Sequence, residues 1–199
     1  MQDMLELIRV RRSVRRYDSR PVAATLVDQL LEAAIWAPSA HNRQPWRFVV
    51  MHGAATKHQL ATAMGEQLRR DLAADGQPAD FIERDVDRSY NRLTTAPLLI
   101  LLSLTLADMD AYPDERRAGN EALMAAQSTA MAGQNILLAA HALGLGACWL
   151  CAPIFCPQTV RRTLDLPDDW QPQGLITAGY PAEKKEKTRY PLGTRVLYR

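Results

Sequence analysis

The chain has 199 residues, of which 47% are hydrophobic and 23% charged, and its formal net charge is +2. This composition is ordinary for a globular protein, and so small a net charge excludes the broad basic field with which proteins bind nucleic acids or acidic membranes. No apolar run approaches the roughly 18 residues of a membrane span, and the first residues lack the apolar core of a secretory signal. We therefore expect a cytoplasmic protein without nucleic-acid or membrane partners. No linker or composition break divides the chain, so we expect one domain over residues 1–199.

The first half of the chain predicts two helices, one short apolar strand and two further helices. Asp3 is the predicted N-cap of the first helix, and Pro38 ends the second. The helices predicted over 54–75 and 78–93 are unusually polar, so we expect them to form a hairpin on the surface rather than part of the core. Residues 65–93 are a candidate lid. The predicted elements are helices over 3–11 and 24–37, a strand over 46–51, and helices over 54–75 and 78–93.

In the second half, the run PLLILLSL predicts a strand that is buried on both faces, and a long alanine-rich segment predicts a helix that ends at GLG (144–146). The tail, residues 181–199, has no core periodicity, and we expect it either to hang free or to reach a partner subunit. The order of elements predicts an α+β fold. These elements are a strand over 97–104, a helix over 115–143, an extended segment over 147–155, a helix over 157–165 and a strand over 174–180.

Basic residues are concentrated near the start of the chain, where the segment RVRRSVRR (9–16) holds five arginines in eight residues. If residues 13–17 are extended, Ser13 and Arg15 lie on one side, and Arg11 joins them where the first helix ends. Guanidinium groups and a hydroxyl that converge in this way suit a phosphate group. The alternative is a basic helix end that complements the helix dipole.

The loop APSAHNRQPWRF (37–48) combines small, uncharged residues with two amide side chains. Pro38, Ser39 and Ala40 offer a flat surface. Asn42 and Gln44 offer donors and acceptors that suit the edge of a planar heterocycle, which makes them candidate cofactor-binding residues. The alternative is an ordinary polar loop.

The three cysteines lie close together, at Cys148, Cys151 and Cys156. A zinc site would need a second cysteine pair or histidines at ligand spacing, and the four histidines offer no such pattern, so we predict no metal. We expect these cysteines to be buried structural thiols, and the alternative is a thioredoxin-like redox motif at Cys148 and Cys151, which have CxxC spacing. In the tail, Lys187 and Arg189 form a second basic pair whose ordinary interpretation is solvated charge.

The sequence contains no nucleotide-binding glycine loop, nucleophile elbow or zinc-binding helix motif, so an enzyme with this sequence would rely on a cofactor. From about Ile8 to Pro191 it resembles the nitroreductase family of FMN-dependent oxidoreductases. The resemblance rests on the order of RRSVR (11–15), APSAHNRQPWRF (37–48), GLGACWL (144–150), AGYP (178–181) and KTRYP (187–191).

The resemblance implies an α+β flavoprotein fold with an antiparallel or mixed sheet surrounded by helices, and an intertwined homodimer that binds FMN at its interface. Cys151 departs from the family pattern, since several members carry an acidic residue there, which affects local polarity. His41 and Arg69 are candidate substrate-binding residues. The residues assigned to FMN are Arg11, Arg12, Ser13, Lys187 and Arg189 at the phosphate and ribityl chain, Arg15 and Asn42 at the pyrimidine edge, and Pro38, Ser39 and Ala40 from one subunit with Trp149, Leu150 and Cys151 from the other at the ring.

A narrower resemblance is to the C-terminal flavin domain of the bifunctional γ-glutamyl ligase that makes the deazaflavin coenzyme factor 420. The function it implies is ping-pong hydride transfer through FMN, from NAD(P)H or another donor to a small conjugated acceptor such as a dehydro precursor of that coenzyme. The alternatives are a broad NAD(P)H nitro- or quinone reductase and a flavin-binding module without turnover.

Overall fold

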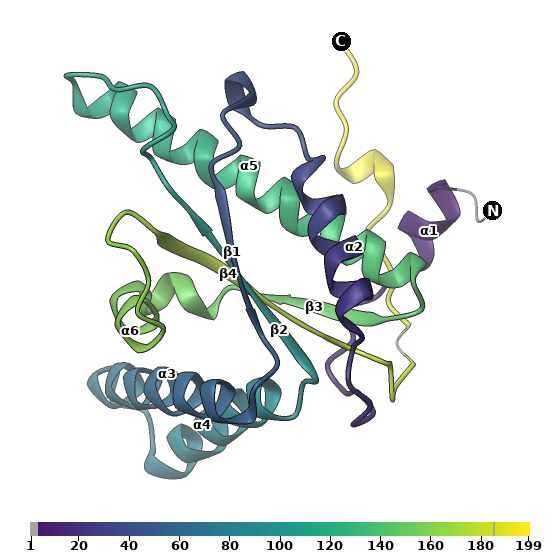
Figure 1. Ribbon diagram of the computed structural model, residues 1–199, viewed down its shortest axis with the longest axis vertical. Helices are drawn as coiled ribbons and strands as arrows, with labels where there is room; N and C mark the ends of the chain where they lie inside the picture. Colours follow the sequence, from purple (N-terminus) through teal and green to yellow (C-terminus); the bar gives the residue numbers. More distant parts are fainter. Residues whose placement is uncertain (1–3, 185) are drawn as a thin grey trace.

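The computed structural model describes residues 4–184 and 186–199, and a four-stranded sheet lies at its centre (Figure 1). The strands are β1 (Trp46–Met51), β2 (Leu98–Leu104), β3 (Gly146–Leu150) and β4 (Gln171–Gly179), in the spatial order β1-β2-β4-β3. Each neighbouring pair is antiparallel. The helices are α1 (Met4–Val10), α2 (Ala24–Ile35), α3 (Ala54–Ala74), α4 (Ala79–Thr94), α5 (Glu115–Ala142) and α6 (Pro157–Thr163), and short 3-10 helices span Ala40–Asn42, Ala152–Phe155 and Leu192–Thr194.

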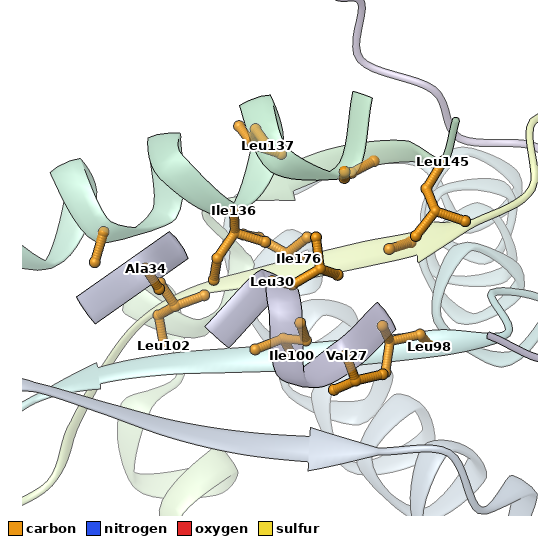
Figure 2. Close-up of a cluster of buried hydrophobic side chains, with 14 of the residues drawn as sticks. Val27, Leu30, Ala34, Leu98, Ile100, Leu102, Ile136, Leu137, Leu145 and Ile176 are labelled. Carbon is orange, nitrogen blue, oxygen red and sulfur yellow. The ribbon is translucent and has the colours of Figure 1, made fainter. Parts of the chain in front are cut away.

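Helices cover both faces of the sheet, which explains why β2 is apolar at nearly every position. Alternate residues of β2 point to opposite faces, so Ile100 packs under α2 and α5 while Leu101 packs under α3 and α6. Figure 2 shows the first of these clusters, in which Leu30 and Ile136 meet Ile100. The result is the predicted α+β fold with a central sheet between two helical layers.

Most of the predicted elements are confirmed, with differences at their ends. The strand predicted from residue 174 begins at Gln171, and the segment predicted as extended over 147–155 divides into β3 and a 3-10 helix. The helix predicted to residue 37 ends at Ile35. The predicted cap Asp3 lies outside the described residues. No helix of the described residues is long and apolar enough to span a membrane.

The prediction that the third and fourth helices lie outside the core is wrong. Leu60 and Met64 of α3 and Leu93 of α4 are buried in the second cluster, against Leu99 and Leu101 of β2. Their charged side chains surround a narrow apolar stripe, which is enough to fix a helix pair to one face of a sheet. A lid function for residues 65–93 stays a prediction.

The prediction of three buried thiols is also corrected. Cys148 and Cys156 are buried, and burial raises the pKa of the Cys156 thiol to about 11. Cys151 is exposed because β3 has ended one residue before it. None of the three is disulfide-bonded.

The indole of Trp149 is packed between two glycines, one from α5 and one from β4. A Cβ added at Gly133 would lie 2.2 Å from Trp149 Cζ3, and one at Gly174 would lie 2.1 Å from Cζ2. Both distances are shorter than van der Waals contact, so the ring fits only because these positions lack a side chain. This contact fixes the end of β3 against the sheet and the long helix.

We predict that Gly133→Ala lowers the free energy of unfolding by about 1–3 kcal/mol, because the added methyl group displaces the indole. The matched control is Gly119→Ala on the same helix, where a new Cβ meets no described atom outside the helix within 4 Å. The control should raise stability by about 0.5–1 kcal/mol, as alanine favours a helix more than glycine does. Urea unfolding measures both, and equal stabilisation by the two substitutions would contradict the packing described here.

Candidate functional site

Residues 13–18 run alongside the sheet and are held by backbone hydrogen bonds on two sides. The Val14 N–H donates to Ala147 O in β3 at 3.1 Å, and the pair Ser13–Ala147 forms a parallel bridge. The Asp18 N–H donates to Tyr180 O at 2.9 Å, and the Ala182 N–H donates to Arg16 O at 3.0 Å. The segment after α1 is therefore joined both to β3 and to the chain that leaves β4.

Side chains fix the same segment. The Tyr17 hydroxyl lies 2.5 Å from Val14 O and 2.7 Å from Thr177 Oγ1, and burial raises its pKa. Val14 is buried against Gly146, where a Cβ would lie 2.8 Å from the valine side chain. Arginines on either side of Val14 are consequently presented from a rigid backbone.

A cavity of about 320 Å³ lies between this segment and the C-terminal tail, and we call it the head–tail pocket. Figure 1 shows the purple α1 and the yellow tail on the same side of the molecule. All six basic or hydroxyl residues that were predicted to bind the phosphate or the pyrimidine edge line this one cavity: Arg11, Arg12, Ser13, Arg15, Lys187 and Arg189.

The charges in the head–tail pocket are close enough to affect one another. The pKa of Arg11 is lowered by burial first, and then by the like charges of Arg189 and Arg12. Repulsion of this kind favours binding of an anion, since a negative group between the guanidinium groups turns each repulsion into an attraction.

Unpaired buried atoms give an independent test of the fit to a phosphate. Arg11 Nη1 and Arg12 Nε are buried and have no hydrogen-bond partner among the described residues. Buried donors without partners are rare, and a phosphate ester supplies the acceptors that they lack. The alternative interpretation, a basic helix end that complements the helix dipole, also has some support. Arg12 Nη1 donates to Arg9 O at 2.5 Å and to Arg11 O at 2.8 Å, at the end of α1.

The loop over residues 38–44 is held in an unusual backbone conformation. His41, Asn42 and Gln44 have φ values of 50°, 54° and 51°, in the left-handed region. Ser39 Oγ accepts from the Gln44 N–H at 3.1 Å, and the Ala40 N–H donates to Ser128 Oγ of α5 at 3.2 Å. The anchored loop exposes Pro38 and the side chains of those three residues.

Within one chain, this loop and the end of β3 are not part of the head–tail pocket, whose lining includes none of residues 38–44 or 149–151. The side chains of Trp149 and Leu150 pack on opposite faces of the sheet, and the exposed Cys151 Sγ lies 3.2 Å from Trp149 Nε1. Contacts of these residues with a cofactor therefore stay predictions, as do those of the loop.

Of the two substrate candidates, His41 is exposed in the loop described above, while Arg69 is engaged elsewhere. Arg69 Nε and Nη2 each donate to a Glu83 carboxylate oxygen at 2.8 Å, and the pKa of Glu83 is lowered mainly by that hydrogen bond. The pair links α3 to α4. This gives Arg69 a structural role, and its substrate role stays a prediction.

A second basic cavity, of about 470 Å³, was not predicted from the sequence. We call it the head–α4 pocket, and it adjoins the first because Arg15 lines both. Residues 88, 91, 92 and 95 are spaced so that they share one face of a helix, and this pattern in the sequence indicates a polar, basic face. Only the fold brings residues 15 and 16 to that face. Its lining residues are Arg15, Arg16, Arg88, Asn91, Arg92, Thr95 and Glu183.

Comparison with known proteins gives relatives over the whole chain. A Thermus thermophilus NADH dehydrogenase is 34% identical over 214 residues, covering 95% of this chain and 92% of that protein. A Methanothermobacter thermautotrophicus protein named "Putative NADH dehydrogenase/NAD(P)H nitroreductase" is 30% identical over 198 residues, covering 98% and 83%. The crystal structure of a "putative nitroreductase in complex with fmn" from Desulfovibrio desulfuricans has a TM-score of 0.77 at 30% identity, covering 100% of this chain and 98% of that one.

The family comparison agrees with the fold and with the resemblance that the sequence motifs carry. The model of the nitroreductase family matches residues 8–180, a span that holds α2 to α6, all four strands and the arginine-rich segment. The chain belongs to the nitroreductase family.

Proposed function

We propose that this protein is an FMN-dependent oxidoreductase that takes a hydride from NAD(P)H and passes two electrons to a small conjugated acceptor. The observation that carries the proposal is the head–tail pocket, where basic side chains from both ends of the chain converge on one cavity. The relatives support it, since two bear names that include NADH dehydrogenase and a similar structure holds FMN.

The side chains fit the phosphate end of FMN. Arg11 and Arg189 would hold the phosphate oxygens, since planar guanidinium groups donate two hydrogen bonds each, and Lys187 would add a point charge. The Ser13 hydroxyl would donate to the phosphate or the ribityl chain, and Arg15 would lie nearer the pyrimidine edge. FMN, when bound, supplies the hydride chemistry, so the protein's contribution is binding, orientation and electrostatics.

We also propose a homodimer in which the loop over residues 38–44 of one subunit completes the site of the other. Exposed apolar side chains support this, for Met4 and Ile8 of α1 are 64% and 48% exposed, and Leu197 and Tyr198 of the tail are 75% and 84% exposed. Burying such surface stabilises association. Analytical ultracentrifugation of the FMN-loaded protein at micromolar concentration should give twice the mass of the chain, and a monomer would exclude this shared site.

The broad reductase is the role that the present relatives favour, and a deazaflavin precursor as acceptor stays a prediction. We also propose a cytoplasmic location. The three cysteines are free thiols, and reducing compartments keep cysteines as thiols.

The purified protein is expected to be yellow. Under anaerobic conditions NADH or NADPH should bleach the flavin absorbance, and a quinone or nitroaromatic acceptor should restore it. Restoration needs turnover through the cofactor, which separates a reductase from a flavin-binding module. A yellow protein that neither nicotinamide bleaches would contradict the proposed function.

Arg11→Ala combined with Arg189→Ala should weaken FMN binding at least 100-fold. Each charge-assisted hydrogen bond contributes about 1.5–3 kcal/mol, and two guanidinium groups are lost. The preparation should be colourless and should melt at a lower temperature in the presence of FMN than the unchanged protein does.

The matched control is Arg199→Ala, which removes one exposed positive charge from the same tail and does not line the pocket. Its FMN content should equal that of the unchanged protein. Full retention of flavin by the double variant would refute the role of the head–tail pocket.

A further inference from the structure

The head–α4 pocket has a surplus of positive charge that the FMN phosphate does not account for. Four guanidinium groups and one carboxylate are among its lining residues. Two arginines come from the segment held beside β3, and two come from α4, where Arg88 and Arg92 lie one helical turn apart.

The acidic groups near this pocket are already engaged by other donors. Glu183 Oε1 accepts from the backbone N–H of Arg15 at 2.8 Å. Asp85 Oδ2 accepts from Arg88 Nη2 at 2.8 Å, within one turn of α4. Asp85 Oδ1 also lies 2.7 Å from Arg88 Nη2, so this carboxylate offsets the charge of one guanidinium group. The guanidinium groups of Arg16 and Arg92 add to a net positive potential in the cavity.

The other lining groups are polar and suit an oxyanion. Asn91 presents an amide side chain, whose N–H groups can donate to an oxyanion. Thr95 Oγ1 already donates its hydrogen to the Asn91 backbone carbonyl at 2.7 Å, so the neutral donor of this pocket is the Asn91 amide. A pocket of guanidinium and amide groups is a poor site for an apolar ring but a good one for phosphate or carboxylate oxygens.

Two other arginines of α3 and α4, Arg69 and Arg84, do not line this pocket and contact side chains elsewhere. Arg69 is paired with Glu83, and the Arg84 guanidinium lies over the Phe81 ring at 5.5 Å. Of the arginines that line the pocket, Arg88 is ion-paired with Asp85, at 2.7 Å from Oδ1, whereas the side chains of Arg16 and Arg92 form no hydrogen bond or ion pair among the described residues. Arg16 and Arg92 are therefore available to a second ligand, and Arg15 makes the two cavities neighbours.

We propose that the head–α4 pocket binds a phosphate or carboxylate group of the second substrate, next to the flavin that the head–tail pocket holds. The proposal rests on the proposed function. In a ping-pong reaction the donor and the acceptor use the same cleft in turn, so the oxyanion belongs either to the nicotinamide nucleotide or to an anionic acceptor. In both cases Arg88 and Arg92 set specificity for charge.

The test compares substrates that differ in charge, using the FMN-loaded protein and the variant Arg88→Ala with Arg92→Ala. The donor pair is NADH and 1-benzyl-1,4-dihydronicotinamide, which lacks phosphates. The acceptor pair is 4-nitrobenzoate and nitrobenzene, which lacks the carboxylate. The matched control is Arg84→Ala, which removes a guanidinium group from the same helix outside the pocket.

The double variant should raise KM at least tenfold for the charged member of one pair, and less than twofold for its neutral partner. A rise with NADH identifies the donor as the source of the oxyanion, and a rise with 4-nitrobenzoate identifies the acceptor. Arg84→Ala should leave the KM of every one of these four substrates within twofold of its value in the unchanged protein. Equal effects on charged and neutral members of both pairs would overturn the proposal.

Binding without turnover gives a second readout. Calorimetric titration of the FMN-loaded protein with ADP and with benzoate should show at least one of them binding, at least tenfold more weakly in the double variant. Binding of neither, or loss of FMN from the double variant, would overturn the proposal, because that loss would assign the arginines to the cofactor. Failure of the proposed function appears elsewhere, as a flavin in the unchanged protein that no donor bleaches.

Discussion

Like charges from opposite ends of the chain are held within one cavity, and the functional interpretation of this protein depends on that arrangement. Arg11 and Arg12 follow the first helix, whereas Lys187 and Arg189 lie in the tail, yet Arg189 is close enough to lower the pKa of Arg11. Folding brings these charges together at a cost in electrostatic energy. An anion in the pocket removes that cost, so ligand binding and stability are linked.

The antiparallel sheet makes this arrangement possible. Strand β3 fixes the arginine-rich segment through Val14, and residues 16 and 18 next to it fix the start of the tail through Ala182 and Tyr180. The Trp149 indole, packed against Gly133 and Gly174, in turn fixes the end of β3. The arginines of residues 11–16 are therefore positioned by backbone hydrogen bonds and close packing of their segment rather than by contacts with one another.

Local patterns predicted the elements that depend on local interactions. The continuous apolar run predicted β2, which helices bury on both faces. The start predicted for the long helix at residue 115 is confirmed, and the structure adds Asp114 as its cap, whose side chain accepts from the Arg117 N–H at 3.0 Å. Elements that depend on distant contacts were missed or misjudged. The first residues of β4 are polar and pair only with the end of β2, and the apolar stripe of α3 and α4 is narrower than their charged surface. The head–α4 pocket needs residues 15 and 16 beside residues 88–95, which only the fold provides.

Equilibrium binding of FMN and of riboflavin to the apoprotein tests the central claim most directly, because the two ligands differ only in the phosphate. With several charge-assisted contacts at about 1.5–3 kcal/mol each, FMN should bind at least 100-fold more tightly at low salt. The difference should shrink as ionic strength rises. Affinities within threefold of each other would contradict the account, because the converging arginines and lysine would then have no phosphate to hold.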